Sequence, residues 1–175
     1  ELIGDRQHPI AVQPIQNVLI WQKEVQMIFQ DAFSSLNPRK TIYDIIAEPI
    51  RNFEKIDANT ENKRIHELLD IVGLTEYAKV IPKNLSGGQQ QRVAIARSIA
   101  NAPKVLIADE PTGNLDPENS WEIMNLLEKI NIQGTTILMA THNSQIVNTL
   151  RHRVIAIENG RIVRDQIEGE YGYDD

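Results

Sequence analysis

Apolar residues along the chain form short runs that predict β-strands. The runs at Val105–Ala108 and Thr136–Ala140 are continuous, as expected of parallel strands buried on both faces of a sheet. Val25–Phe29 alternates only in part and also predicts a strand. Residues 154–164 are expected to form a hairpin, because Asn159-Gly160 suits a type I′ turn. Strands that alternate with helical segments indicate an α/β fold with a mainly parallel sheet.

Helical periodicity and capping residues predict the helices between these strands. The predicted helix starts are Thr41, Thr60, Ser86 and Asp116. The first helix is expected to end near Pro49 and the second at Gly73. A short helix is expected through Ile146 and Leu150, whereas residues 1–20 have no sustained period and are expected to be strand and loop.

These elements are expected to form one domain, residues 1–175, with two parts. Residues from about 40 to 100 form a helical subdomain, inserted into an α/β core of residues 1–39 and 101–168. From residue 165 onward the chain carries acidic residues and no basic one. Residues 169–175 are therefore expected to be a solvated, frayed acidic tail.

Composition excludes several classes of protein. The net charge of −6 argues against nucleic acid as a partner, because duplex-binding surfaces are usually basic. No apolar run approaches the roughly 20 residues of a membrane-spanning helix, which still leaves a membrane protein open as a partner. The absence of cysteine excludes disulfides and Cys-ligated zinc. The sequence begins at Glu1 without an initiator Met, so we expect it to be part of a longer chain.

The loop at Leu85–Gln89 has the features of a phosphate-binding site. Ser86 is a good N-cap, and Gly87 and Gly88 have no Cβ, so a phosphate can closely approach their backbone N–H groups. The amino end of the following helix adds a partial positive charge. The same residues also suit an ordinary capped helix with two loop glycines, and alone they do not decide between the two interpretations.

Polar side chains follow three of the predicted strands. Gln30 follows the first, Asp109 and Glu110 end the second, and His142 follows the third. Open α/β sheets bind ligands at the carboxyl ends of their strands. There a Gln or Asp oxygen can ligate Mg²⁺, a Glu can orient an attacking water, and a His can bond phosphate oxygens.

Together these segments resemble the nucleotide-binding domains of ABC (ATP-binding cassette) ATPases, over residues 25 to about 170. Leu85–Gln89 resembles their signature motif, Val105–Glu110 their Walker B strand, and Asn114–Asp116 their D-loop. The resemblance implies catalytic roles for Glu110 and His142, nucleotide binding by Gln30, Ser86, Gly87, Gly88, Gln89, Asp109 and Asp116, and ligation of Mg²⁺ by Gln30 and Asp109.

The resemblance also implies partners. In the family, two ATPase domains close head to tail around ATP, so Ser86 to Gln89 would serve the nucleotide of a second ABC ATPase subunit. The helical subdomain would dock on integral membrane subunits. The protein would then be cytoplasmic and peripheral, on the inner face of the cell membrane.

One family motif is absent from these 175 residues. The P-loop, G-x-x-x-x-G-K-[ST], requires a Gly-Lys pair, and the sequence contains none. That loop supplies most of the phosphate cradle. We therefore expect an incomplete P-loop NTPase core with an exposed sheet edge, and little ATP binding or hydrolysis by this chain alone.

Two branches of the family are represented in the sequence. Residues 25–85 resemble the ATPases of oligopeptide and metal-chelate importers, whereas residues 113–173 resemble the cell-division ATP-binding protein, which suggests a composite of two related genes. Our main hypothesis is an ATP-hydrolysing subunit, or a fragment of one, that powers transport of a peptide or metal chelate. The alternatives are a cell-division ATPase with a septal membrane partner, and a non-catalytic chain that supplies only the signature motif.

Overall fold

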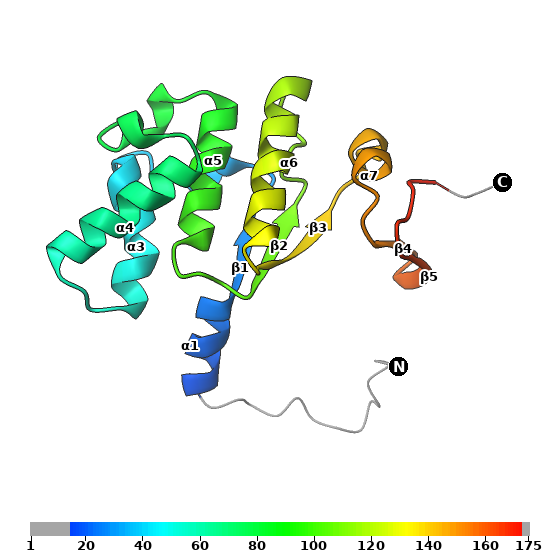
Figure 1. The fold of residues 1–175 in the computed structure, drawn as a ribbon, viewed down its shortest axis with the longest axis horizontal. Helices are drawn as coiled ribbons and strands as arrows, with labels where there is room; N and C mark the ends of the chain where they lie inside the picture. The colour runs from blue at the N-terminus through cyan, green and yellow to red at the C-terminus, as the bar shows by residue number, and fades with distance from the viewer. Residues whose placement is uncertain (1–14, 173–175) are drawn as a thin grey trace. The chain divides into compact units, whose positions relative to one another are not determined.

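The computed structural model describes residues 15–172 (Figure 1). The chain divides into two compact units, Glu1–Ala140 and Thr141–Asp175, where the sequence predicted one domain. The first unit contains, in order, α1 (Ile15–Glu24), β1 (Val25–Ile28), α2 (Ala32–Ser35), α3 (Ile42–Phe53), α4 (Ala58–Ile71), the 3₁₀ turns η1 (Thr75–Tyr77) and η2 (Pro82–Asn84), α5 (Gly87–Ile99), β2 (Val105–Asp109), α6 (Pro117–Ile132) and β3 (Thr136–Ala140). The second contains α7 (Ser144–Leu150), β4 (Val154–Glu158) and β5 (Arg161–Gln166).

The first unit is built on a parallel sheet with the strand order β1-β2-β3. Ile28 pairs with Ala108, and Asp109 pairs with Ala140, so the three strands end at nearly the same level. All three predicted strands are therefore confirmed. Because the strands are parallel, the residues that follow them meet at one edge of the sheet.

Burial of the strands differs from the expectation. In β2 only Leu106 and Ala108 are fully buried; Val105 and Ile107 are half-buried, and Asp109 is exposed. In β3 no residue is fully buried, and Leu138 is 56% exposed. The prediction of two buried faces is wrong for β3, because Ile137 and Met139 are half-buried whereas Thr136, Leu138 and Ala140, on the opposite face, are exposed.

The long helix α5 is the core of the first unit. Val93, Ile95 and Ala96 are fully buried on it. It contacts β1 and the helices α2, α3, α4 and α6, and Figure 1 shows α3 and α4 gathered on the side of α5 away from β2. The regular elements within residues 42–99 are thus all helical, and this part of the chain packs on β1 through α5.

Two predicted helix boundaries in this region are wrong. Pro49 lies inside α3, which continues to Phe53 because Ile50 is fully buried and the backbone N–H of Glu54 bonds to the carbonyl of Ile50. The second helix, α4, begins at Ala58 rather than Thr60. Its N-cap is Asp57, whose carboxylate accepts hydrogen bonds from the two backbone N–H groups at residues 59 and 60. Gly73, with φ +68°, follows its end as expected.

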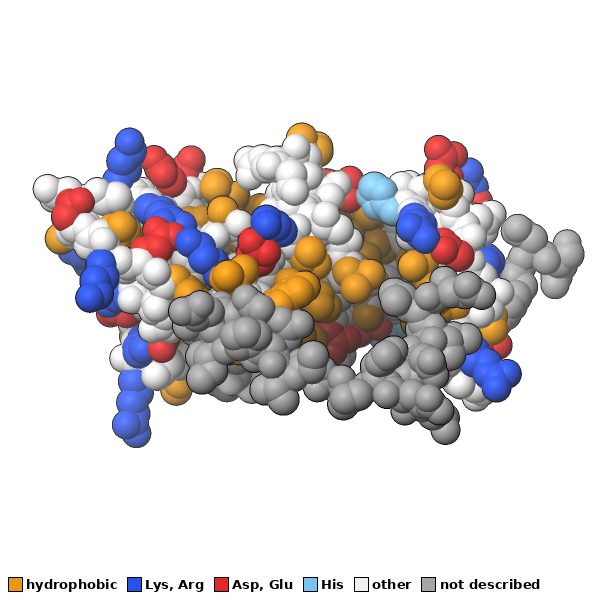
Figure 2. Space-filling model, turned by 90° about the horizontal axis from the view of Figure 1, so that it is seen from below, with side chains coloured by type: hydrophobic (Ala, Val, Ile, Leu, Met, Phe, Trp, Pro, Cys, Tyr) orange, Lys and Arg blue, Asp and Glu red, His pale blue; other side chains and the backbone are white. Residues whose placement is uncertain are grey.

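The segment before β1 also differs from the prediction. Residues 15–24 form α1, not strand and loop, while residues 1–14 lie outside the described range. Val18, Ile20 and Trp21 are all exposed on α1, so these three apolar residues do not form a buried stripe of the kind that reveals a helix in a sequence. Figure 2, which views the molecule from below, shows exposed hydrophobic side chains between charged ones on this side.

The second unit holds the predicted hairpin. β4 and β5 are antiparallel, and both Asn159 (φ +50°) and Gly160 (φ +75°) have the positive φ that a type I′ turn requires. Two residues in the described part of the predicted acidic tail make contacts with the preceding loop. Glu170 forms an ion pair with Arg151, and the buried Gly169 donates its N–H to the carbonyl of His152.

Within residues 15–172, no helix combines the length and the apolar character that crossing a membrane requires.

Candidate functional site

The signature segment begins α5 with a complete capping box. The Ser86 hydroxyl accepts a bond from the backbone N–H of Gln89 (3.3 Å), and the Gln89 side-chain oxygen accepts one from the backbone N–H of Ser86 (2.9 Å). Ser86 and Gly87 are exposed. The predicted cap is confirmed, and it fixes the backbone that a phosphate would meet at this helix start.

The two signature glycines have different surroundings. Gly87 is exposed, and a Cβ there would meet nothing closer than a Leu115 methyl at 3.6 Å. Gly88 is buried, and a Cβ on it would lie 2.3 Å from the Asn119 side-chain oxygen. Gly88 therefore lacks a side chain because the first turn of α6 occupies that space. The sequence had explained this glycine only by the close approach of a phosphate.

Asp109 and Glu110 lie where the sequence predicts them, at the carboxyl end of β2. Asp109 is the last residue of the strand and is exposed. Glu110 turns the chain out of the sheet with φ +44°, and its N–H bonds to the carbonyl of Ala140 at 2.9 Å. A positive φ is uncommon for a side chain of this size and costs free energy, which the bond to β3 helps to offset.

Gln30 is close to the loop that follows Glu110. A Cβ on Gly113 would lie 3.1 Å from the Gln30 Nε2 and 3.5 Å from the Glu110 Cβ. The Asn114 amide also donates to the carbonyl of Gln30 (3.4 Å). The structure thus brings Gln30 and Glu110 together around Gly113, where a Cβ would require the end of the Gln30 side chain to shift slightly and would make an ordinary contact with Glu110.

Asp116 serves as the N-cap of α6. Its carboxylate accepts bonds from the backbone N–H of Asn119 (3.0 Å) and from the Asn119 side-chain amide (2.6 Å). The backbone bond from Asn119, followed by the side-chain bond, lowers the pKa of Asp116. Asp116 therefore orients the side chain that packs against Gly88, and its predicted contact with nucleotide stays a prediction.

His142 follows β3 by two residues and lies in the second unit, where it is exposed. The short helix predicted through Ile146 and Leu150 is confirmed as α7, which begins at Ser144 with Asn143 as its N-cap. The convergence of His142 with Gln30 and Glu110 stays a prediction.

The donors at the strand ends suit Mg²⁺ held together with phosphate. Gln30 and Asp109 offer amide and carboxylate oxygens, which hard cations prefer, but Mg²⁺ takes six ligands. In the described part of the chain no group of three or more His, Asp or Glu side chains could hold a metal ion. Phosphate oxygens and water would have to complete the coordination, as is usual where Mg²⁺ accompanies a nucleotide.

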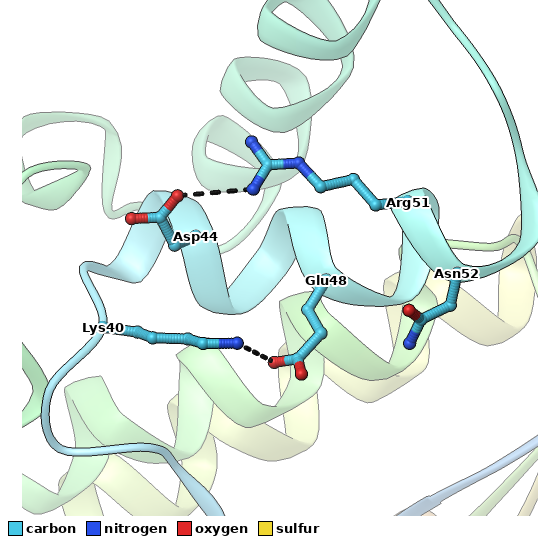
Figure 3. Close-up of a pocket in the computed structure, with 5 residues that line it drawn as sticks. All are labelled: Lys40, Asp44, Glu48, Arg51 and Asn52. Atoms are coloured by element: carbon cyan, nitrogen blue, oxygen red, sulfur yellow. Dashed lines mark ion pairs between the residues drawn. The ribbon is translucent and has the colours of Figure 1, made fainter.

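A surface pocket lies elsewhere, along α3 (Figure 3). It is lined by Lys40, Asp44, Glu48, Arg51 and Asn52. Lys40 pairs with Glu48 at 3.0 Å and Arg51 with Asp44 at 3.5 Å, so the charges of its lining are balanced in pairs. None of the predicted site residues lines this pocket. It belongs to the helical part that the sequence assigns to docking.

Sequence reasoning missed two residues of the site, Gly113 and Asn119. Gly113 was predicted only as loop, and its closeness to Gln30 depends on the pairing of β1 with β2. Asn119 lies three residues after an N-cap, a spacing that indicates capping and gives no sign of a contact with Gly88.

Comparisons with known proteins agree with this geometry. A family model described as ABC transporter matches residues 5–113, more than half of the chain. The cell division ATP-binding protein FtsE of Streptococcus pneumoniae is 64% identical over 162 residues, which cover 91% of this chain and 68% of that protein. The oligopeptide transport ATP-binding protein OppF of Lactococcus lactis is 55% identical over 156 residues, covering 88% of this chain and 49% of that protein. Each of these two alignments runs over most of the chain.

Two solved structures share the fold. The structure of cbiO1 from Clostridium perfringens, part of the ABC transporter complex cbiONQ, matches with a TM-score of 0.81 and 31% identity, over 89% of this chain and 61% of that one. A dimeric structure of the ATP-binding cassette MJ0796, bound to ADP and Pi, matches with a TM-score of 0.77 and 30% identity, over 92% and 70%. The predicted fold class is confirmed as the P-loop fold of ABC ATPases, with a parallel sheet and a C-terminal hairpin. With its signature helix and its strand-end carboxylates in place, the chain belongs to the ABC transporter family as an ATPase domain.

Proposed function

We propose that this chain is the larger part of an ATPase subunit that acts in cell division with a membrane partner. The observation that carries the ATPase assignment is the meeting of Gln30, Asp109 and Glu110 at one edge of a parallel sheet. The signature segment at Ser86 begins a separate helix, as trans binding to a second subunit needs. The cell-division role is supported by the higher identity to FtsE, 64% against 55% for OppF.

Each residue at the sheet edge has a role in this proposal. Glu110 orients the attacking water, and Asp109 and Gln30 hold Mg²⁺ beside the terminal phosphates. The metal, when bound, neutralises charge that develops on the phosphate oxygens. Such positioning and electrostatic effects account for most of the catalysis of phosphoryl transfer.

Nucleotide binding needs more than these 175 residues. The P-loop sequence is absent from them, and they span only about half to two thirds of the relatives named above. We therefore assign hydrolysis to a protein in which this chain is joined to a P-loop segment, and a dimer of such proteins would place each signature on the partner's ATP. The dimeric structure of MJ0796 supports this assembly.

The membrane partner would contact the helical part of the first unit. The pocket along α3 supports this, because its ion pairs are exposed and contribute little to stability. Its charged side chains could therefore leave those pairs and bind polar groups of a partner protein instead. The protein would then work at the cytoplasmic face of the membrane. Peptide import is the second candidate function, supported by the 55% identity to OppF.

Substitution of Glu110 tests the ATPase proposal. In the intact protein, Glu110→Gln keeps the size of the side chain and removes its charge, so we expect Mg-ATP to bind normally while turnover falls at least about a hundredfold. Glu118→Gln, an exposed carboxylate in the first turn of α6, is the control. Turnover by Glu110→Gln equal to that of the control would refute the assigned role.

A genetic test separates the two candidate functions. Depletion of the protein should give a division defect without loss of peptide uptake, and the intact gene should restore division. Loss of peptide uptake with normal division would favour import instead.

A further inference from the structure

The chain after β5 returns to α7 and is bonded to it. The backbone N–H of Tyr171 donates to the side-chain oxygen of Asn148 on α7 at 2.6 Å. The carboxylate of Glu170 pairs with Arg151, the C-cap residue of this helix. Residues 169–171, which we call the tail segment, therefore hold α7 at two points, and Figure 1 shows the chain turning back toward this helix.

The tail segment is also attached to the hairpin. Gly169 donates its N–H to the carbonyl of His152 at 3.0 Å, and a Cβ on Gly169 would lie 2.7 Å from the Cβ of Val154 in β4. The guanidinium of Arg164 in β5 donates to the carbonyl of Glu170 at 2.6 Å. The tail segment thus joins α7 to both strands of the hairpin, so closely that a side chain at residue 169 would require β4 to shift.

The backbone conformation of Arg151 indicates that its side chain has a role. With φ +51° and ψ +41°, this residue is left-handed, a conformation that helix ends usually reach with glycine or asparagine. Glycine would avoid the cost of a side chain there but could not form the ion pair with Glu170. Because both partners of this pair are exposed, the pair adds little to stability. Its effect is therefore expected in where it holds α7.

At its other end, α7 fixes the residues on both sides of His142. The side chain of Asn143 accepts a bond from the backbone N–H of Ile146, and the backbone N–H of Asn143 donates to the hydroxyl of Thr141, both at 3.1 Å. Ile146 is buried and anchors the helix. A helix of only seven residues carries a displacement from one end to the other as a rigid element, so the tail segment bears on the position of His142.

We propose that the tail segment is a positioning element for His142: through Asn148 and Arg151 it holds α7, and thereby the imidazole, where the imidazole can reach a terminal phosphate. This inference rests on the proposed ATPase function and on the catalytic role predicted for His142. It assigns no contact between the tail segment and nucleotide. It gives a role to the first residues of the predicted acidic tail, which the proposed function leaves without one.

The test uses the intact ATPase and variants at two similarly exposed arginines. Arg151→Met removes the ion pair with the tail segment, and Arg151→Lys keeps a charge that can pair with Glu170. Arg153→Met is the matched control, because Arg153 pairs instead with Asp165 of the hairpin, and the side chains of the two pairs are 58% and 44% against 62% and 42% exposed. Asn148→Ala removes the second attachment without weakening α7, since alanine is the better helix former.

The measurements on each variant are kcat, KM for ATP, the urea midpoint and the NMR signal of the His142 ring, which is assigned by its loss in His142→Gln. We expect Arg151→Met and Asn148→Ala to lower kcat about tenfold with KM changed less than about twofold, since misplacement of a catalytic group affects the reaction more than binding. The His142 signal should broaden or divide, because the ring then occupies more than one position. Arg151→Lys should recover part of both effects, and the urea midpoints should equal that of the control.

Several outcomes would overturn the inference. One is an Arg151→Met protein with the kcat and His142 signal of Arg153→Met, and another is a fall in kcat with an unchanged His142 signal. A fall that merely follows a lowered urea midpoint would indicate a structural role, and normal turnover in His142→Gln would remove the group that is positioned. A wild-type protein without ATPase activity would refute the proposed function and this inference together, whereas an active wild type with an unaffected Arg151→Met refutes the inference alone.

Discussion

Replacing Gly88 by alanine tests the packing of the signature helix against α6. A Cβ at this position would lie 2.3 Å from the Asn119 side-chain oxygen, 2.8 Å from its Cγ and 3.2 Å from its Cβ. Asn119 cannot avoid it by a small shift, because its amide is bonded to the Asp116 carboxylate at 2.6 Å. The side chain must rotate away, and that bond is then lost.

The expected cost follows from two opposing effects. Overpacking by a methyl group typically costs about 1–3 kcal/mol, whereas alanine improves helix propensity over glycine by up to about 1 kcal/mol. Gly88 lies in the first turn of α5, where the propensity gain is smaller. We therefore expect Gly88→Ala to lower the free energy of unfolding by about 1–2 kcal/mol.

The assay is urea unfolding of the 175-residue chain without nucleotide, so that a loss of phosphate contacts cannot contribute. Gly87→Ala is the matched control, because its Cβ would meet only a methyl at 3.6 Å, and we expect a change within about 0.5 kcal/mol. Asn119→Ala removes the conflicting atoms. The double variant Gly88→Ala/Asn119→Ala should show a favourable coupling energy of about 1 kcal/mol. Equal stability of the two glycine variants, or no coupling with Asn119, would refute the reasoning.

Three further predictions concern single side chains. Ser86→Ala removes the capping hydroxyl and should destabilise the chain by about 1 kcal/mol in the same unfolding assay, whereas Ser86→Asp should retain most of the stability. Hydrogen bonding from Arg51 lowers the pKa of Glu61 below its ordinary value of 4.5, so its stabilising effect is present above that pH and lost as the pH falls through the lowered pKa. Unfolding of Glu61→Gln should then depend less steeply on pH below 4.5 than that of the wild type, and parallel curves would contradict this assignment. Leu138 is exposed on β3, which pairs only with β2 among the described residues, so we expect the wild-type chain to self-associate through this strand. Leu138→Lys should then associate less in sedimentation velocity, with little change in stability. Equal sedimentation of the two proteins would contradict this.

The strand ends were predictable from sequence because their signals are local. Each strand is a short, mainly apolar segment with a polar residue at its end or within two residues after it, and parallel pairing places those residues at one edge without further information. The caps at Ser86 and Asp116 were predictable for the same reason, since a capping side chain bonds within three residues of itself.

The errors arose where tertiary contacts override local signals. Pro49 normally ends a helix, but burial of Ile50 continues α3 beyond it. β3 has the apolar composition of a buried strand, yet one of its faces is exposed, and its own sequence does not state what packs on each face. The contacts of Gly88 with Asn119 and of Arg97 with Ser35 likewise join residues far apart in the chain.

The left-handed backbone at Glu110 has a consequence for protein engineering. Glycine or asparagine would adopt φ +44° more readily than glutamate does, so a selection for heat resistance alone should favour them at this position. Under the proposed function, such a selection would discard the carboxylate that orients water and yield more stable proteins with little ATP turnover. The proposed role would thus account for a glutamate at this position at the expense of thermal tolerance.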